Sequence, residues 1–280
     1  MRYQISPPER PDELAVEPSS SGVGFGGTAT DSAVAIHLAD VSKSFGDVTA
    51  IQGIDLTVAR HSRIGIVGPS GGGKTTLLQI VAGLLEPDGG QVSVEGATIA
   101  KERLARCALM PQRDLLLPWR TALDNAGIAL ENRGVSRAEA RNRTKPLFER
   151  FGLARFEHVR PAQLSGGMRQ RVSFLRTLMA EKDVLLLDEP FGALDSITRG
   201  EMQYWLASAM DEVPRTVLLV THDVEEAILL SKLVVVLSAR PGRIVRILEV
   251  DHVSGGSRRE IVTNRAFVAL KEQALEALES

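Results

Sequence analysis

The sequence predicts an α/β fold with a mostly parallel sheet, a small antiparallel β subdomain in front of it and an inserted helical subdomain. Two observations predict the sheet. An apolar run, a glycine-rich turn and a helical pattern follow one another between residues 63 and 83, and apolar runs alternate with helical patterns between residues 183 and 237. Such alternation builds βαβ units with parallel strands. A charge-rich helical stretch between these parts predicts the helical subdomain, at about residues 113–167.

Bulk composition narrows the class of protein. The 280 residues carry 33 Lys and Arg against 35 Asp and Glu, a net charge of −2, so nothing favours nucleic acid as the main partner. Cys107 is the single cysteine, which excludes a disulfide framework and predicts a reducing compartment. No apolar run approaches the roughly 20 residues that span a bilayer. We therefore expect a cytoplasmic protein.

The N-terminal part falls into two stretches. Residues 1–33 are rich in Pro, Ser and Gly and cannot bury enough apolar surface to offset the entropy of ordering, so we expect a disordered tail. Residues 34–38 and 51–58 alternate between apolar and polar types and are predicted to be half-buried antiparallel strands. A turn is expected between them at residues 44–47.

A phosphate-binding motif follows a buried strand predicted at residues 63–67. It fits the pattern G-x-x-x-x-G-K-[ST], with the residues Gly68, Pro69, Ser70, Gly71, Gly72, Gly73, Lys74, Thr75 and Thr76. The glycines let backbone N–H groups wrap an anion, and the helix N-terminus adds unpaired donors. Lys74 is expected to reach the β- and γ-phosphates of a nucleotide, and Thr75 to bind Mg²⁺. An ordinary capped loop would not need the complete pattern.

Phe45 lies in the turn before this motif. It is either a core residue or a flat surface for an adenine ring, and the sequence leaves both interpretations open. After the motif, strands are predicted at residues 91–94 and 106–110. From residue 121 to about 152 the periodicity is helical. Ser136 is predicted to cap a helix that Pro146 should kink or break.

Two carboxylates follow a strand that is apolar at every position from 184 to 187. Asp188 and Glu189 are adjacent at the strand end, so their side chains should point to different sides and do different work. An Asp after such a strand supports the metal ion in P-loop enzymes, which leaves Glu189 to polarise a water molecule. The alternative interpretation is that these two acids only end the strand and have no chemical role. The presence of the phosphate-binding motif in the same chain makes this alternative less favourable.

A second glycine-bearing helix start contains Ser165, Gly166 and Gly167. Plain N-capping by Ser165 is one interpretation. Close approach of a ligand explains the two glycines better, because they cost backbone entropy in a helix. The chain then has two phosphate-ready helix starts, which serve either two sites or one site built across two chains.

The remaining elements continue the α/β pattern. A helix is predicted at residues 196–212, a strand at 216–220, a helix at 223–231 and a strand at 233–237. Residues 265–279 place Phe267, Leu270, Ala274 and Leu278 on one helical face, which predicts a helix that docks on the rest of the chain.

Six motifs in this order resemble those of the ATP-binding subunits of ABC transporters. They comprise residues 68–75, Gln112, residues 164–168, 184–189, 193–195 and 221–223. The resemblance covers about residues 34–250, an ABC-type P-loop ATPase domain, and leaves residues 251–280 as a C-terminal extension. It implies a homodimer that sandwiches two ATP molecules, each between the P-loop of one copy and the Ser165–Gly166–Gly167 segment of the other.

The resemblance also implies a role for each matching residue. Lys74 and the P-loop amides would hold phosphate, while Thr75, Gln112 and Asp188 would support Mg²⁺. Glu189 would polarise the water molecule, His222 would contact the γ-phosphate and Asp195 would bridge the dimer. Phe45 stands where the family usually has an aromatic residue stacked on adenine. Gly72 departs from the family, which usually has Cys or Ser there.

Finer likeness lies in residues 111–119, 190–199, 220–227 and 237–243, which are similar to the importer branch for nitrate, taurine, aliphatic sulfonates or thiamine-precursor pyrimidines. That branch implies two permease subunits, an extracytoplasmic solute-binding protein and a place on the cytoplasmic face of the cell membrane. Leu115, Leu116, Leu117 and Trp119 form an apolar cluster that is either core or an interface.

Two other classes of function remain to be weighed. A soluble ABC ATPase that acts on DNA or ribosomes usually has tandem nucleotide domains, coiled coils or basic arms, and this chain has none of these patterns. A nucleotide-binding scaffold that does not hydrolyse ATP is disfavoured by the intact Glu189. Purification of the native complex separates the three, because a permease, nucleic acid or neither would accompany the chain.

Overall fold

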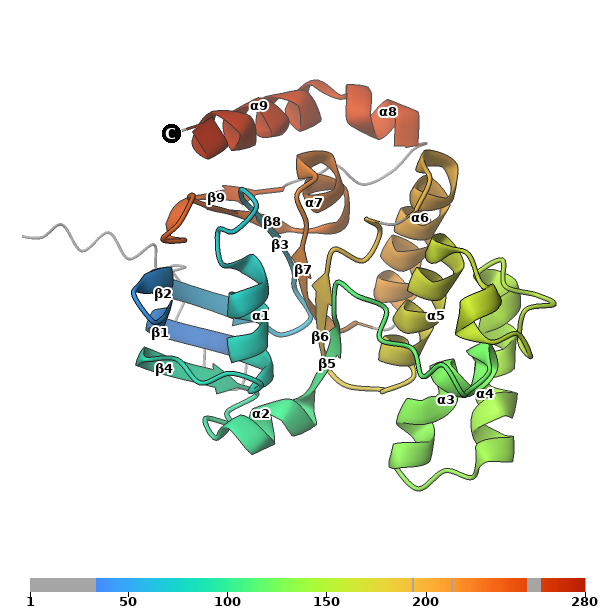
Figure 1. Ribbon diagram of the computed structural model, residues 1–280. Helices are drawn as coiled ribbons and strands as arrows, with labels where there is room; N and C mark the ends of the chain where they lie inside the picture. The colour runs from blue at the N-terminus through green and yellow to red at the C-terminus, as the bar shows by residue number, and fades with distance from the viewer. Residues whose placement is uncertain (1–33, 193, 213, 251–257, 280) are drawn as a thin grey trace, which may run out of the picture.

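The computed structural model describes residues 34–192, 194–212, 214–250 and 258–279. The predicted tail at residues 1–33 lies outside the described residues. An antiparallel sheet, a mostly parallel sheet and a group of helices follow one another across the molecule, as Figure 1 shows. Among the described residues, no helix is both long and apolar enough to cross a membrane.

The antiparallel sheet has the strand order β2-β1-β4, with β1 at Val34–Phe45, β2 at Val48–Ala59 and β4 at Gly89–Val94. The predicted strands are confirmed, but both are longer than the alternation indicates. The register runs from Val34 opposite Ala59 to Phe45 opposite Val48. Only Gly46 and Asp47 form the turn, because Gly46 adopts a positive φ of 58° that lets the chain reverse in two residues.

The second sheet has the order β5-β6-β7-β3-β8-β9. Its parallel strands are β3 Arg63–Val67, β5 Cys107–Met110, β6 Val184–Asp188, β7 Thr216–Val220 and β8 Leu233–Leu237. β6 and β7 are buried at every position, as expected for strands covered on both faces. An antiparallel strand, β9 Ile244–Glu249, closes one edge. The sequence analysis did not predict β9, which is buried only at Leu248.

Helix α1, Lys74–Ala82, joins the two sheets into one core. Its Leu77, Leu78 and Ile80 are fully buried in a cluster with residues of both sheets. Gly83 ends the helix in the left-handed conformation, as the sequence predicts. The short helix α2, Ala100–Arg106, was not predicted.

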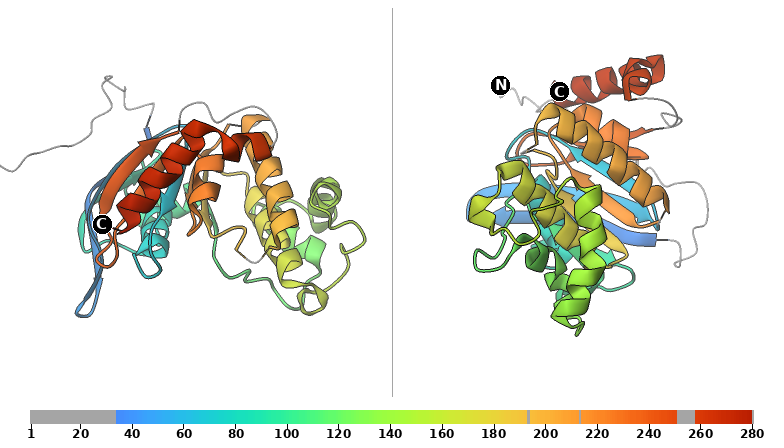
Figure 2. Two further views of the ribbon diagram at one scale, coloured as in Figure 1. Left: turned by 90° about the horizontal axis from the view of Figure 1, so that it is seen from above. Right: turned by 90° about the vertical axis from the view of Figure 1, so that its right-hand side faces the viewer.

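The helical part consists of α3 Ala122–Asn132, α4 Arg137–Arg150, a 3₁₀ turn at Pro161–Gln163, α5 Gly166–Leu178 and α6 Ser196–Glu212. Figure 2 shows it to one side of the sheets. Ser136 caps α4 as predicted, since its hydroxyl accepts from the N–H of Glu139. The predicted break at Pro146 is wrong, because α4 continues to Arg150. Phe148, two residues further along, is fully buried, and this packing offsets the loss of the hydrogen bond that proline removes.

Helix α9, Arg265–Glu279, lies over β8, β9 and helix α7, Val224–Leu230 (Figure 1), and the short helix α8, Arg258–Thr263, comes just before it and contacts it. Phe267 and Ala274 of α9 are buried against these elements, and Lys271 pairs with Glu225 at 2.6 Å. The helix predicted at residues 265–279 is therefore present and packs through its apolar face. α8 was not predicted.

Candidate functional site

A pocket of about 500 Å³ opens where β3 passes into α1. That volume suits a small organic ligand. The β1–β2 hairpin forms one wall and the loops after β5 and β6 form another. The lining residues are Phe45, Val48, Ala50, Ser70, Gly71, Gly73, Lys74, Thr75, Thr76, Gln112, Glu189 and Arg240.

The floor of the pocket is the predicted phosphate-binding loop. Gly73 precedes α1 with a positive φ of 80°, and no side chain caps the helix, so the first helical N–H groups are free of a side-chain acceptor. Lys74 is buried, and its Nζ donates to the carbonyls of Gly68 at 2.7 Å and Pro69 at 2.8 Å. Burial lowers the pKa of Lys74, while the nearby carboxylates Glu189 and Asp188 act in the opposite direction. The loop thus offers an anion both backbone donors and a cation.

Thr75 and Asp188 meet beneath the loop. The hydroxyl of Thr75 donates to Oδ2 of Asp188 at 2.8 Å, and Asp188 is only 3% exposed. Burial raises the pKa of Asp188, and the charge of Glu189 raises it further, whereas Thr75 and Lys74 lower it. A cation beside this carboxylate would offset the cost of burying its charge.

The oxygen atoms available here fit Mg²⁺. Thr75, Asp188 and Gln112 offer hydroxyl, carboxylate and amide oxygens, the hard ligands this ion prefers. Among the described residues there is no group of three His, Cys, Asp or Glu side chains that could cage a metal ion. Such a site suits an ion shared between the protein and substrate phosphates.

Glu189 is held in an uncommon backbone conformation. Its φ is +47°, and its N–H donates to the carbonyl of Val220 at 2.8 Å. Its side chain accepts from Nε2 of Gln112 at 3.1 Å, and its Oε1 lies 3.4 Å from Nδ1 of His222. Three residues predicted from separate motifs therefore converge at the edge of the pocket. Strained positions of this kind are common at functional sites.

Phe45 is an exposed wall of the pocket and not a core residue. Its side chain is 51% exposed, and Lys43 Nζ lies 5.8 Å from the ring centroid. Three other lining residues, Val48, Ala50 and Arg240, were not predicted. Val48 and Ala50 follow Phe45 on the same hairpin, and this position in the sequence could have identified them as pocket residues. Arg240 belongs to residues 237–243, a stretch noted for its similarity to one importer branch but given no role in the site.

The structure does not bring every predicted residue to the pocket. Ser165 accepts from the N–H of Met168 at 3.2 Å and caps α5, and Gly166 and Gly167 form the first turn of that helix. A Cβ on Gly166 would come no closer than 3.9 Å to a neighbour, so packing within the chain does not require this glycine. Asp195 accepts from the N–H of Thr198. None of these four residues lines the pocket.

A family model described as ABC transporter matches residues 51–192, which hold the P-loop, Gln112, the Ser165 segment and Glu189. This chain belongs to the ABC transporter family. Within that family it is an ATPase whose fold combines a mostly parallel sheet with an antiparallel subdomain.

Curated relatives of this ABC ATPase match it over most of their length. It is 43% identical over 245 residues to the aliphatic sulfonates import ATP-binding protein SsuB 1 of Rhodococcus jostii (strain RHA1), covering 88% of this chain and 94% of the relative. It is 38% identical over 237 residues to the taurine import ATP-binding protein TauB of Rhizobium johnstonii, covering 83% and 90%. Among solved structures, a dimeric ATP-binding cassette in a post-hydrolysis state, bound to ADP and Pi, has a TM-score of 0.71. The two sequences are 28% identical, and the match covers 79% of this chain and 100% of that one.

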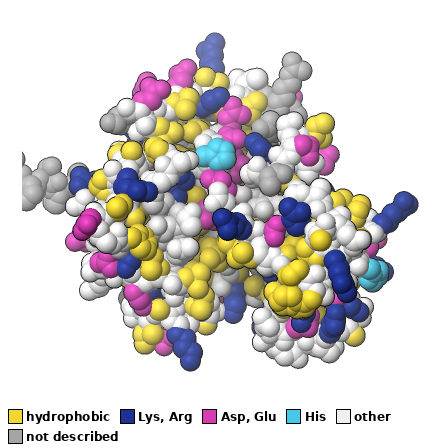
Figure 3. Space-filling model, in the orientation of Figure 1, with side chains coloured by type: hydrophobic (Ala, Val, Ile, Leu, Met, Phe, Trp, Pro, Cys, Tyr) yellow, Lys and Arg dark blue, Asp and Glu magenta, His cyan; other side chains and the backbone are white. Residues whose placement is uncertain are grey.

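The apolar cluster after Gln112 is divided between core and surface. Leu116 is 8% exposed and packs in the core of the helical part, whereas Leu115 and Trp119 are 61% and 69% exposed. The core interpretation therefore holds for Leu116, whereas Leu115 and Trp119 keep the exposed side chains that an interface would need. On the face drawn in Figure 3, hydrophobic side chains lie beside Lys and Arg side chains over the helical part.

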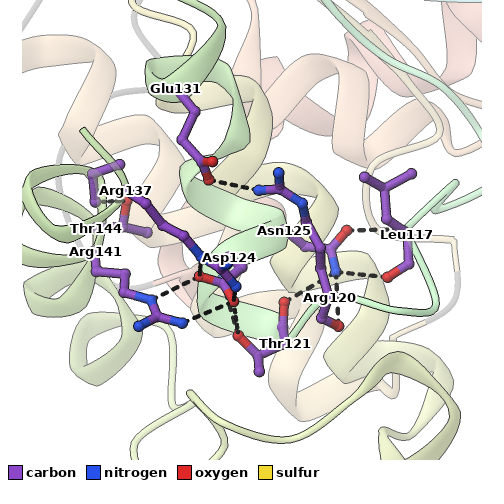
Figure 4. Close-up of polar contacts among 10 residues, drawn as sticks. Leu117, Arg120, Thr121, Asp124, Asn125, Glu131, Arg137, Arg141 and Thr144 are labelled. Carbon is purple, nitrogen blue, oxygen red and sulfur yellow. Dashed lines mark hydrogen bonds and ion pairs between the residues drawn. The ribbon is translucent and has the colours of Figure 1, made fainter. Parts of the chain in front are cut away.

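A polar network fixes the backbone of this segment (Figure 4). Asn125 accepts from the N–H of Leu117 at 2.7 Å and donates to the carbonyl of Leu117 at 3.1 Å. The neighbouring Asp124 is fully buried and binds the guanidinium groups of Arg137 and Arg141, which hold the pKa of this carboxyl well below its usual range against the effect of burial. The exposed side chains are therefore carried on a rigid support.

Proposed function

We propose that this ABC ATPase energises the import of a small sulfonate, such as taurine or an aliphatic sulfonate. The convergence of Gln112, Glu189 and His222 at the edge of the P-loop pocket is the observation that carries the hydrolytic part. The names of relatives that are 38% and 43% identical support the solute class. Nitrate and thiamine-precursor pyrimidines are the alternative solutes within the same branch.

In this proposal the P-loop binds the phosphate chain of ATP. The N–H groups from Ser70 to Thr76 and the Nζ of Lys74 would contact phosphate oxygens, and the exposed ring of Phe45 would stack on adenine. Lys74 would exchange its two carbonyl acceptors for phosphate. Thr75, Asp188 and Gln112 would hold Mg²⁺, which when bound neutralises charge that develops on the phosphates.

Hydrolysis would depend on Glu189. Glu189 lines the pocket, and its carboxylate would orient a water molecule there and accept its proton. Gln112 donates to that carboxylate and fixes its rotamer. The exposed imidazole of His222, 3.4 Å from Glu189, would contact the γ-phosphate.

A second copy of the chain would complete each site. Ser165, Gly166, Gly167 and Asp195 do not line the pocket of their own chain, and the open Cβ position at Gly166 leaves room for close approach of a ligand. The solved structure with 28% identity is dimeric and bound to ADP and Pi. We infer that the Ser165 segment of one copy contacts ATP held by the P-loop of the other, with Asp195 at the interface between the copies.

The same proposal implies membrane partners. Exposed Leu115 and Trp119, on the support provided by Asn125, would contact permease subunits at the cytoplasmic face of the membrane. The permeases in turn would receive solute from an extracytoplasmic binding protein. We assign residues 34–250 to the ATPase domain, about 113–167 to its helical subdomain and 251–280 to a C-terminal extension. Within that extension, residues 251–257 lie outside the described residues.

Uptake measurements test the solute. A strain that lacks this chain should lose uptake of labelled taurine or an alkanesulfonate and recover it with the intact chain. Glu189→Gln should fail to restore uptake although it accumulates to the same level. Normal sulfonate uptake in the deletion strain, with loss of nitrate uptake or of pyrimidine uptake, would assign a different solute.

A further inference from the structure

The turn between β8 and β9 brings an arginine to the rim of the nucleotide pocket. Arg240 lines the pocket, as do Ser70 and Gly71 of the phosphate-binding loop. Its Nε donates to the carbonyl of Gly71 at 3.4 Å, and a Cβ built on Gly71 would lie 3.2 Å from its Nη2. The guanidinium group therefore lies over the phosphate-binding loop itself.

The turn is fixed on the strand that forms one wall of the pocket. The N–H of Gly242 donates to the carbonyl of Ala50 at 2.9 Å, and the N–H of Gln52 donates to the carbonyl of Gly242 at 3.0 Å. Nη2 of Arg243 donates to Oε1 of Gln52 at 2.6 Å. Arg240 is thus presented by a braced segment of backbone.

The other side of the turn rests on the P-loop. A Cβ on Gly72 would lie 2.9 Å from the carbonyl oxygen of Ser238, and a Cβ on Gly242 would lie 2.2 Å from the carbonyl oxygen of Gly72. Real Cβ atoms do not approach so closely, so both glycines are required for this contact. The departure at Gly72 therefore has a physical reason, which is the close packing of the turn that carries Arg240.

Charge distinguishes Arg240 from the other lining residues. Lys74 is the other cation in the pocket wall, and it is buried on the carbonyls of Gly68 and Pro69. Arg240 is exposed, and within the described part of the chain its guanidinium bonds to Gly71 without pairing with a carboxylate. A guanidinium group has five N–H donors, so most of them remain available to an anion.

We propose that Arg240 is a second cationic ligand for the phosphate chain of the bound nucleotide. A planar guanidinium group recognises phosphate through paired, charge-assisted hydrogen bonds, and its place over Gly71 puts it beside the phosphate-binding amides. The inference rests on the proposed binding of ATP in this pocket. A residue that only braces the loop would need a donor toward Gly71 but no charge, which separates the two roles.

Calorimetric titration with Mg·ATP and Mg·ADP tests the proposal. Arg240→Gln keeps a donor but removes the charge, and both nucleotides should bind about 10-fold more weakly or worse. Arg240→Lys keeps the charge and should retain most of the affinity. The matched control is Arg246→Gln, which removes the same charge from an exposed position on β9, outside the pocket wall and outside the contacts that brace the turn. It should bind as the unmodified chain does.

Two outcomes would overturn the proposal. One is an unchanged affinity in Arg240→Gln. The other is an equal loss in Arg240→Gln and Arg240→Lys, which would assign Arg240 to the shape of the loop. Lys74→Ala separates these outcomes from failure of the proposed function. Suppose that the unmodified chain binds ATP, that Lys74→Ala does not, and that Arg240→Gln binds ATP as tightly as the unmodified chain. Then only the proposed role of Arg240 is wrong, and the proposed binding of ATP in this pocket stands. If the unmodified chain binds no ATP, the proposed function itself fails.

Discussion

The amide Nε2 of Gln112 donates to Oε2 of Glu189 across 3.1 Å, although 77 residues separate the two in sequence. Gln112 follows strand β5 and Glu189 follows β6, and these strands are adjacent and parallel. The carboxyl ends of neighbouring parallel strands meet at one edge of the sheet, which places both side chains beside the P-loop. Gln112 also begins the segment that carries Leu115 and Trp119. One hydrogen bond therefore links the carboxylate that we propose acts in hydrolysis to the segment with exposed apolar side chains.

Replacement of the Glu189 carboxylate should separate ATP binding from ATP hydrolysis. In Glu189→Gln we expect ATP affinity close to that of the unmodified chain, because the P-loop supplies the phosphate contacts. The rate of hydrolysis should fall by about 10²–10⁴-fold, the usual contribution of a positioned general base. Calorimetry and a phosphate-release assay measure the two quantities. Turnover within about threefold of normal would remove Glu189 from this role.

Mixed dimers should show that each site is shared. Lys74→Ala and Ser165→Ala are each expected to be inactive as homodimers. In a mixed dimer, one site combines both changes and the other combines an intact Lys74 with an intact Ser165 of the opposite chain. We therefore expect nucleotide trapping to return in half of the sites.

The control for this experiment mixes Lys74→Ala with the double variant Lys74→Ala/Ser165→Ala. No site in that dimer has an intact P-loop, so trapping should stay absent. If the first mixture also fails while mixed dimers demonstrably form, both contacts come from a single chain.

Replacement of Leu116 and of Trp119 by alanine should affect the stability of the fold to very different extents. Leu116→Ala removes a buried side chain and should lower the free energy of unfolding by about 2–5 kcal/mol. Trp119→Ala removes a side chain that is 69% exposed and should change it by less than about 0.5 kcal/mol. Urea unfolding measures both free energies.

In the assembled transporter, Trp119→Ala should reduce the stimulation of ATPase activity by the loaded binding protein but spare the basal rate of ATP hydrolysis. A large loss of stability in Trp119→Ala would show that Trp119 is a core residue and not part of an exposed interface.

Stability should depend on pH through Glu226. This side chain is 4% exposed between α6 and α7, where Nε2 of Gln203 is 3.4 Å from its Oε2. Burial, followed by the charge of Asp223, raises the pKa of Glu226 to about 7. The folded state then binds more protons than the unfolded state between the ordinary pKa and about 7, so stability falls as the pH rises through this window. The change amounts to ~3 kcal/mol.

Glu226→Gln tests this prediction because it stays neutral at every pH and keeps a polar group toward Gln203. Urea unfolding at about pH 5, 6.5 and 8 should show a flatter profile for the variant and greater stability than the unmodified chain at the highest pH. Asp223 and Arg199 also act on this carboxyl, and both are unchanged in the variant, so a difference between the two profiles reports on Glu226 itself. Parallel profiles for the two proteins would contradict the assignment.

Sequence patterns alone predict the strand, turn and helix of the P-loop and most of the buried strands. The pattern around Lys74 fixes a strand, a turn and a helix within about twenty residues, and hydrophobic periodicity identifies strands such as β6 and β7 because a buried strand must be apolar on both faces. The pairing of Asp188 with Glu189 likewise indicated two carboxylates at one strand end.

The exposure of single side chains and the contacts between distant residues depend instead on how the elements pack together. Leu116 and Trp119 belong to one apolar run, yet one is buried and the other is not, because that depends on where α3 and its Asn125 hold the segment. Pro146 stays within α4 because Phe148 packs in the core. Arg240 reaches Gly71 from 169 positions away through the packing of one turn against another. Burial and long-range contacts arise between elements, whereas sequence patterns describe each element alone.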